Sequence, residues 1–415
     1  MNSPPSAPAP TSTLRRDPFL LFARPDIGEA EVAAVAETMR SGWITTGPRV
    51  KAFEREFAEY VGVPHAVAVN SCTAALHLGL EALGVRAGDE VLTSTVTFTA
   101  TAEVAEYLGA RARFVDVEPD TLNVSVDQLR RILDDYRWVE GAWRHHESGG
   151  RLAAILPVHY GGHPCDMDAL LALAAERGVP LFDDAAHALP AAIGGHRIGA
   201  LPCPTAFSFY ATKTITTGEG GMFCTADAAL ADRVRLMALH GISHDAWNRY
   251  GSNGTWYYEV VEAGYKYNLT DLAAAIGRVQ LARADEMHRR RQAIAAHYTA
   301  AFAGLEAVEL PAVRSGVCHA WHLYPIRLRL DALQVDRARF IRELHARGIG
   351  TSVHFIPLHQ QPFYARRYGY RPEDLPVAAA AYPRLVSVPI YSAMSDEDVE
   401  SVIAAVTDVT DTFRA

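Results

Sequence analysis

The chain has 415 residues, 49% of them hydrophobic and 21% charged, a composition typical of a globular protein with two or three domains. Its 39 basic and 48 acidic side chains give a formal net charge of −9, which argues against a nucleic-acid-binding or membrane-binding surface and favours small-molecule ligands. The five cysteines are scattered and form no CxxC pair, which predicts reduced thiols in the cytoplasm rather than a disulfide framework, and no metal site.

The N-terminal 17 residues are rich in proline, serine, threonine and alanine, and we predict a disordered tail over 1–17. This segment is too polar for a signal peptide, and no stretch of the chain approaches the roughly 18 uninterrupted apolar residues that a membrane span needs. Apolar residues at helical spacing then predict helices over 29–41 and 49–61, on either side of a turn that contains glycine and proline.

Short apolar runs alternate with helix-length segments between residues 65 and 225. Most of these runs are continuously apolar, which is typical of strands buried on both faces of a mostly parallel sheet. Helices are predicted between them over 73–83, 99–108 and 167–177. The pattern therefore predicts an α/β fold with a seven-stranded sheet. The predicted strands are 65–70, 90–95, 112–117, 153–158, 179–184, 206–210 and 221–225.

A second α/β unit is predicted in the C-terminal third of the chain. A long helical pattern covers 271–302 and precedes a strand over 321–330. A helix over 337–348, a strand over 351–357 and a final helix starting at Ser395 follow. We predict a large domain over 18–280 and a smaller C-terminal domain over 281–415.

The first strand is followed by a candidate phosphate site. In "NSCTAALHL" the strand gives way to Ser71, Cys72 and Thr73, and a helix then begins. Free backbone N–H groups and the helix dipole at such a start suit a phosphate, and small side chains leave room for it. The alternative is a simple helix cap, because serine and threonine are preferred at that position in any case.

A pair of carboxylates ends the strand in "LFDDAAHALPA". A carboxylate at the depth of Asp184 needs a cationic or hydrogen-bonding partner, because burying it unpaired is costly. His187 follows after two alanines. The alternative is that Asp184 caps the next helix and His187 is a hydrogen-bonded core histidine.

Lys213 lies in the loop between two predicted buried strands, in "AFSFYATKTITTGEGGM". Ser208 precedes it by five residues, and the glycines behind it permit tight turns and close backbone approach. A lysine at the edge of a sheet can lose its proton and act as a nucleophile, although a solvated loop lysine is the commoner case. Phe98, after another strand, is either a core residue or a platform for a flat ring.

These features complement one another chemically. Together they offer a nucleophilic amine, a carboxylate able to pair with a ring nitrogen, a phosphate cradle and an aromatic face. Pyridoxal 5′-phosphate (PLP) needs this set, because it carries an aldehyde, a pyridine nitrogen, a phosphate and a planar ring. The residues therefore predict PLP as cofactor, with Lys213 forming the imine and Asp184 holding the nitrogen protonated.

The same residues lie in ordered motifs that resemble the DegT/StrS family of PLP-dependent sugar aminotransferases, from about residue 20 to the C-terminus. The resemblance is carried by "SGWITTGPRVKAFEREFAEYVG", "NSCTAALHLGLEALGVRAGDEVLTSTVTFTAT", "PVHYGGHPCDM", "DDAAHALPA", "SFYATKTITTGEGGM", "GYKYNLTDLAAAIG" and "HAWHLYPI". Within the family, "HYGG", "DAAHA", "GYKYNLTD" and "HAWHL" look most similar to enzymes that aminate UDP-linked 4-keto sugars.

The resemblance implies an aspartate-aminotransferase-type fold (fold type I) and a homodimer with shared active sites. It implies that Lys213 forms the Schiff base and moves protons, and that Asn268 reaches the phosphate of the partner subunit's cofactor. The implied reaction moves the amino group of L-glutamate to a keto group of a nucleotide-linked sugar by ping-pong exchange. The remaining residues that it assigns to the cofactor are Ser71, Cys72, Thr73 and Ser208 at the phosphate, Phe98 on the ring face, Asp184 at the ring nitrogen and His187 near the phenolic oxygen.

Two segments depart from the family pattern. Residues 135–152 form an insertion with two tryptophans, which either shapes a substrate pocket or decorates the surface; we favour the surface. The stretch 354–364 contains His354 and His359, which we predict to lie near the substrate. Two alternatives stay open: amination of a keto-cyclitol, and a non-enzymatic PLP-fold binding or regulatory protein. A sugar 3-dehydratase is disfavoured, because in that branch a histidine replaces the lysine.

Overall fold

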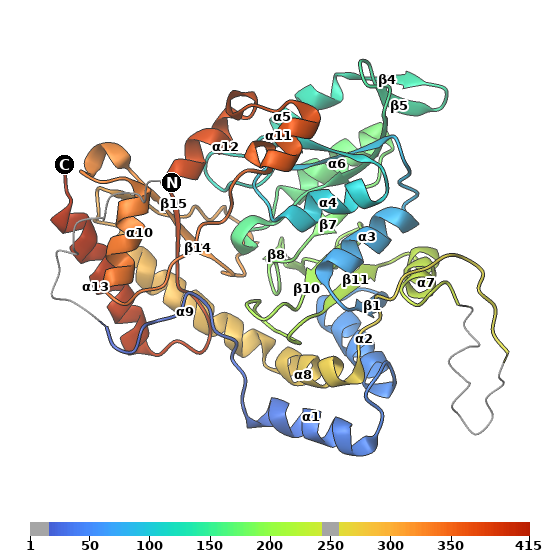
Figure 1. Ribbon diagram of the computed structural model, residues 1–415, viewed down its shortest axis with the longest axis horizontal. Coiled ribbons are helices and arrows are strands. Elements are labelled where there is room, and N and C mark those ends of the chain that lie inside the picture. The colour runs from blue at the N-terminus through green and yellow to red at the C-terminus, as the bar shows by residue number, and fades with distance from the viewer. Residues whose placement is uncertain (1–15, 243–256) are drawn as a thin grey trace, which may run out of the picture.

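The seven strands that the sequence predicts between residues 65 and 225 are all present, in two hydrogen-bonded groups. Helices surround these strands (Figure 1). In the computed structural model, which describes residues 16–242 and 257–415, two groups of strands are joined by parallel bridges from Ile155 to Leu181 and from Val158 to Asp184. The spatial order is β3-β2-β6-β7-β10-β11-β1, in which β11 runs antiparallel to both its neighbours. The strands are β1 (His65–Val69), β2 (Asp89–Ser94), β3 (Arg111–Val115), β6 (Arg151–Leu156), β7 (Asp183–Asp184), β10 (Thr205–Ser208) and β11 (Gly221–Thr225).

Helices cover both faces of this sheet, which explains why its strands are apolar on both sides. One face packs against α3 (Cys72–Ala82), α4 (Thr99–Tyr107) and α7 (Ala228–Met237). The other face packs against α2 (Pro48–Val61), α5 (Val126–Leu133), α6 (Met167–Arg177) and α8 (Asp271–Ala282), and α1 (Glu29–Ser41) lies against α8. The carboxyl ends of the parallel strands thus meet at one edge, where ligands collect in such sheets.

The C-terminal part of the chain has a second core around an antiparallel sheet of β12 (Val308–Glu309), β14 (Tyr324–Leu328) and β15 (Leu385–Val388). Its helices are α9 (Ala284–Phe302), α10 (Arg337–Ala346) and α13 (Asp396–Thr412), whereas α11 (Pro362–Tyr368) and α12 (Pro376–Ala381) extend over the first unit. A small third sheet joins β8 (Ala192–Ile193), β9 (His196–Arg197) and β13 (Val317–Cys318). The domain division at residue 280 stays a prediction.

Three predicted elements differ from the structure. The pattern over 271–302 is two helices, because the chain bends at Arg283, whose guanidinium pairs with Asp26 and Glu31. The strand predicted over 351–357 is wrong: Ser352 makes a single bridge to β15, and the chain then turns away from that sheet. Of the predicted tail, residues 1–15 lie outside the described part of the chain, whereas Arg16 is held by an ion pair with Asp398.

The insertion over 135–152 is a surface hairpin, as favoured above. Its strands β4 (Tyr136–Val139) and β5 (Ala142–His145) pair with each other, β5 joins the sheet at Arg151, the first residue of β6, and Trp138 is exposed. The base of the hairpin is tied down, because the hydroxyls of Tyr136 and Ser148 donate to the buried carboxylate of Glu90 in β2. None of the hairpin residues lines the central cavity described next.

Candidate active site

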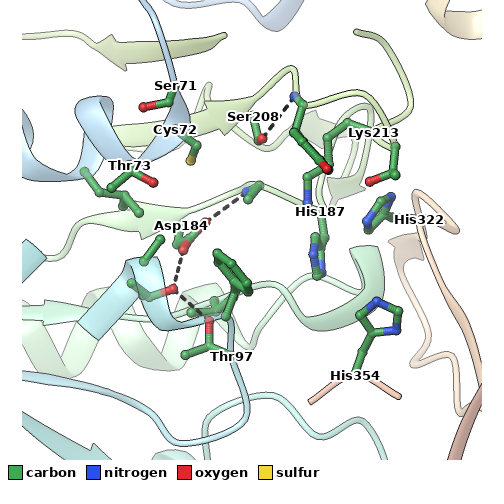
Figure 2. A pocket seen from close by; sticks show the side chains of 18 of the residues that line it. Ser71, Cys72, Thr73, Thr97, Asp184, His187, Ser208, Lys213, His322 and His354 are labelled. Carbon is green, nitrogen blue, oxygen red and sulfur yellow. Dashed lines mark hydrogen bonds between the residues drawn. The ribbon is translucent and has the colours of Figure 1, made fainter. Parts of the chain in front are cut away.

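A cavity of about 460 Å³ opens at the carboxyl ends of the parallel strands (Figure 2). It brings together side chains from segments that lie up to almost 300 residues apart in the sequence. The sequence-predicted residues that line it are Ser71, Cys72, Thr73, Phe98, Asp184, His187, Ser208, Lys213 and His354. Residues that the sequence did not single out also line it, among them Thr97, Thr101, Tyr210 and His322.

Asp184 is a buried carboxylate held by neutral donors. It closes β7, and only 3% of its surface is exposed. Oδ2 accepts from the Thr101 hydroxyl at 2.7 Å and Oδ1 from the Ala186 N–H at 3.0 Å. Among the described residues no cationic side chain lies within 4.0 Å of it. Burial therefore raises the pKa of Asp184, and its hydrogen bonds offset only part of that effect. A cation brought into the cavity would relieve this cost.

Thr101 continues into a short chain of hydroxyls. Because its proton goes to Asp184, its oxygen accepts from Thr97, 2.7 Å away. Both threonines belong to "VTFTAT" (96–101), in which the sequence pattern predicts a ligand contact for Phe98 alone. The signal that could have found Thr101 is its place three residues after Phe98, on the first turn of α4.

Replacement of Thr101 by valine is expected to destabilise the cofactor-free protein by roughly 1.5–3 kcal/mol at neutral pH, because a buried carboxylate loses a donor. Removing that donor raises the pKa of Asp184 further, so the loss should shrink as the pH falls through this pKa and the carboxyl becomes neutral. Urea unfolding at a series of pH values measures it. Thr38→Val is the matched control: it also loses a buried hydroxyl, but one bonded to a backbone carbonyl, so its cost should not vary with pH.

Lys213 lies across the cavity from the start of α3, in the loop that reverses the chain between β10 and β11. Its side chain is half-buried, and no carboxylate of the described residues lies within ion-pair distance of its Nζ. Burial lowers its pKa to about 8, although Asp184 and the thiol of Cys72 act in the opposite direction. A substantial fraction of the amine is therefore neutral near pH 8, and the neutral form is the one that can act as a nucleophile.

The start of α3 forms an anion cradle. Ser71 caps the helix by accepting from the Ala74 N–H at 3.0 Å, so the capping interpretation holds as well. The N–H groups of Cys72 and Thr73 have no carbonyl partner within their own helix, as at any helix start. A Cβ at Gly221 would come within 2.6 Å of the Ser71 carbonyl and the Cys72 nitrogen. The glycine run therefore lets β11 pass directly under the cradle.

His187 is neutral, and the direction of its ring is fixed. The Gly161 N–H donates to its Nδ1 at 3.3 Å, which leaves the proton on Nε2. Burial and the charge of Lys213 hold the pKa of His187 well below its usual range. Its ring lies 4.3 Å from that of His322, whose Nδ1 is buried without a partner. The site thus offers an N–H donor in this wall.

Two motifs meet at His187. A Cβ at Gly162 would overlap the His187 carbonyl at 2.8 Å, and its φ of +97° also favours glycine. The carbonyls of Gly161 and Gly162 accept from the N–H groups of Leu323 and Ala320. The glycines of "HYGG" thereby position "HAWHL", and this is how His322 enters the cavity. Its position in a quoted motif was the available signal.

Phe98 is not a core residue. It precedes α4, its side chain lines the cavity, and 60% of it is exposed. An exposed aromatic face inside a cavity is suited to stacking on a flat ring. The ring of Phe355 lies 6.2 Å away and continues this aromatic wall.

Of the three remaining predicted residues, His354 lines the central cavity, whereas His359 and Asn268 lie elsewhere. His359 is fully buried outside the cavity, where its Nδ1 bonds the Thr95 hydroxyl at 2.7 Å, a placement that does not support contact with substrate. His354 does line the cavity, held by the Ser387 hydroxyl at 2.9 Å, and burial lowers its pKa to about 4. Asn268 lies at a different cavity of about 520 Å³, beside Trp43 and Thr46.

The residues of the central cavity fit PLP. A buried carboxylate without a cationic partner among the described residues, a helix start with free N–H groups, an exposed aromatic face and a partly neutral amine match, in turn, the pyridinium, phosphate, ring and aldehyde of that group. Across 16–242 and 257–415 we find no cluster of three or more side chains arranged to bind a metal. Within the same residues no helix combines the length and apolar character needed to cross a bilayer.

The chain is similar to proteins of one family throughout its length. The sequence profile of the DegT/DnrJ/EryC1/StrS aminotransferase family matches residues 25–407. The spore coat polysaccharide biosynthesis protein SpsC of Bacillus subtilis is 46% identical over 396 residues, which cover 95% of this chain and 98% of SpsC. The PLP form of Spr1654 from Streptococcus pneumoniae superposes with a TM-score of 0.85 and 32% identity, over 95% of this chain and 99% of that one. The sugar aminotransferase CalS13 of Micromonospora echinospora is 30% identical, with a TM-score of 0.80 over 93% of this chain and 99% of CalS13.

Proposed function

Because the chain belongs to the DegT/DnrJ/EryC1/StrS aminotransferase family and is a PLP-dependent sugar aminotransferase, we propose that it transfers the amino group of L-glutamate to the 4-keto group of a nucleotide-linked sugar. The exchange is ping-pong, with 2-oxoglutarate released before the keto sugar binds. We also place the enzyme in the cytoplasm, on the grounds of its five unpaired cysteines.

The observation that carries the proposal is the convergence of Lys213 and Asp184 on one cavity. PLP supplies an electron sink for the carbanion formed when a proton leaves the substrate carbon. Asp184 would keep the ring nitrogen protonated, Phe98 would pack on the ring, and the N–H groups at the start of α3 would hold the phosphate with Ser208. Lys213 would hold the cofactor through its aldehyde, and its amine would be the group that accepts and returns a proton.

The acceptor is assigned from motifs and from one relative. "HYGG" and "HAWHL" resemble enzymes that act on UDP-linked 4-keto sugars, and the structure gives these motifs a shared place beside His187. The name of SpsC refers to spore coat polysaccharide biosynthesis, which supports a sugar acceptor for a chain 46% identical to it. His322 and His354 face the same space and are candidates to bind sugar hydroxyls.

The acceptor is tested with purified holoenzyme and a panel of UDP- and dTDP-linked 3-keto and 4-keto sugars. L-glutamate alone should shift the visible absorbance of the bound cofactor, and a nucleotide-linked 4-keto sugar should restore it. Restoration only by a keto-cyclitol would assign aminocyclitol synthesis instead. A spectrum unchanged by glutamate would support a non-enzymatic binding protein.

We further propose that the enzyme is a homodimer whose sites share residues, with Asn268 reaching the cofactor phosphate bound by the partner. Asn268 bridges to Val69 at the end of β1, and its Nδ2 donates to the Thr46 hydroxyl. Trp43 and Ile44 are exposed beside it, as expected of an apolar surface that a partner covers.

Mixed dimers test the shared site. Lys213→Ala and Asn268→Ala chains should each lose activity, whereas their mixture, unfolded and refolded together, should recover about one quarter of the native activity. The fraction follows because half of the dimers are mixed and each mixed dimer contains one intact site. Activity is measured as glutamate-dependent turnover. No recovery, with refolded native chain as the control, would place both residues in one subunit's site.

A further inference from the structure

A second cavity, of about 710 Å³, adjoins the active site. The two cavities share Thr97, Phe98 and Phe355, so Phe98 separates them and a bound molecule can pass from one to the other along its ring. One wall of the second cavity is the exposed face of α4. The opposite wall is the segment 353–364, which ends in the first turn of α11.

Large apolar side chains gather in this second cavity. Besides Phe98, it exposes Tyr107, Ile356 and Phe363 to between 43% and 56% of their surfaces. Single exposed apolar residues are ordinary, but several around one hollow mark a binding surface. The aromatic members suit the apolar face of a ring. Gln361 also lines this cavity, and the apolar side chains by themselves do not discriminate among rings.

Glu103 supplies the discrimination. Its half-buried carboxylate accepts from the Thr99 hydroxyl at 3.2 Å and from that of Tyr107, and no cation pairs with it among the described residues. The neighbouring Glu106 is already occupied by Arg367, at 3.1 Å, and by Tyr368. A carboxylate has about four acceptor positions and no donor, so Glu103 keeps free acceptors for groups that donate.

The charge of the cavity excludes another ligand class. No lysine or arginine is among the side chains that line it. A phosphate placed there would meet the carboxylate of Glu103, and the nearby guanidinium of Arg367 is already paired with Glu106. Phosphate binding is therefore unfavourable at this degree of burial. The ring that fits is therefore neutral, apolar on one face and rich in hydroxyl groups at its edge.

We propose that this second cavity binds a neutral ring with vicinal hydroxyl groups, linked to the acceptor sugar, and that Glu103 accepts hydrogen bonds from those hydroxyls while Phe363 packs on the ring. The inference rests on the proposed sugar-amination function and names a further part of its substrate. Two sources share this chemistry: the ribose of a nucleotide and a second glycosyl unit. In either case the phosphates lie outside the cavity.

Binding to the holoenzyme tests the inference, with uridine and methyl β-maltoside as probes of the two sources. At least one probe should bind the native enzyme, and Glu103→Gln should weaken that binding roughly 10-fold or more, because hydrogen bonds to a charged group are lost. Phe363→Ala should weaken it as well. Glu140→Gln, in the turn between β4 and β5, makes the same charge change far from the cavity and should leave binding unchanged.

A probe that lacks the vicinal hydroxyl groups separates hydrogen bonding to Glu103 from nonspecific binding. If uridine binds, 2′,3′-dideoxyuridine should bind the native enzyme as weakly as uridine binds Glu103→Gln, and should lose nothing further in the variant. Binding of neither probe, or equal binding to native and variant enzyme, would overturn the inference. The absorbance change with L-glutamate should be the same in all variants, which shows that they fold and load cofactor.

Failure of the second cavity as a substrate site can be distinguished from failure of the proposed amination function. If keto sugars are turned over and Glu103→Gln leaves their KM unchanged, the second cavity is not a substrate site although the enzyme aminates sugars. If a probe binds through Glu103 but no nucleotide-linked keto sugar is turned over, the cavity stands and the proposed acceptor does not.

Discussion

Replacement of Lys213 by alanine is expected to abolish the covalent attachment of PLP and to lower turnover by at least about 10²–10⁴-fold, the contribution typical of a positioned proton-transfer group. After borohydride reduction and denaturation, native enzyme should retain the cofactor mass on the peptide containing Lys213, whereas the variant should release all of it. Lys213→Arg preserves the positive charge and should fail in the same way, which separates the role of the amine from that of its charge.

The pH dependence of attachment follows from the same lysine. Because burial lowers the pKa of Lys213 to about 8, its neutral, nucleophilic form should increase as the pH rises toward that value and level off above it. An ordinary lysine would still be gaining reactivity near pH 10. Stopped-flow absorbance of cofactor-free protein mixed with PLP measures this rate. A rate that keeps rising tenfold per pH unit beyond pH 9 would show that Lys213 is solvated.

Replacement of Asp184 by asparagine is expected to act in opposite directions on the loaded and the cofactor-free protein. With PLP bound, the pyridinium would lose its charged partner, and affinity should fall by roughly 3–5 kcal/mol, about 150- to 4,000-fold. Without PLP, the substitution removes a buried carboxylate that has no cation within ion-pair distance in the described part of the chain. Unfolding of the cofactor-free variant should therefore need more urea than that of the native chain.

The sign of the pH effect follows from the raised pKa of Asp184. A carboxyl whose pKa is higher in the folded than in the unfolded state costs stability above its unfolded pKa of about 3.9, and the cost is complete above its folded pKa. The stability difference between native and variant chains should thus be largest at neutral pH and vanish in acid. Asp166→Asn removes the charge of an exposed helix cap but keeps an oxygen that can accept from the Ala169 N–H, so it should lower stability only slightly. If Asp184→Asn also lowers stability at pH 7, the carboxylate is not a burden that PLP relieves.

Most of the site was predictable because its residues directly follow buried strands. Asp184 and Ser71 come at strand ends that the apolar pattern identifies, and Lys213 is confined between β10 and β11. Their chemistry is also unusual for such positions, so residue type and position reinforce each other. The seven-stranded sheet was predicted for the same reason: continuous apolar runs between amphipathic helices leave few other arrangements.

What the sequence did not provide depends on contacts between distant segments. His322 reaches His187 only because the backbone of Gly161 and Gly162 binds residues 320–323. His354 and His359 are close in sequence, but the chain bends between them, so that one lines the cavity and the other packs on Thr95. A strand predicted over 351–357 gave no means of telling them apart. Whether the Glu103 carboxylate keeps free acceptor positions likewise depends on which cations pack beside α4.

The contact between Gly221 and the cradle at Ser71 and Cys72 also restricts protein engineering. With 2.6 Å or less between a hypothetical Cβ and that backbone, even alanine would have to push β11 and α3 apart. The phosphate cradle cannot therefore be reshaped for a bulkier cofactor analogue by changing its own side chains alone. Libraries aimed at this cofactor site are better directed to Phe98 and Thr101 on α4, with residue 221 held constant.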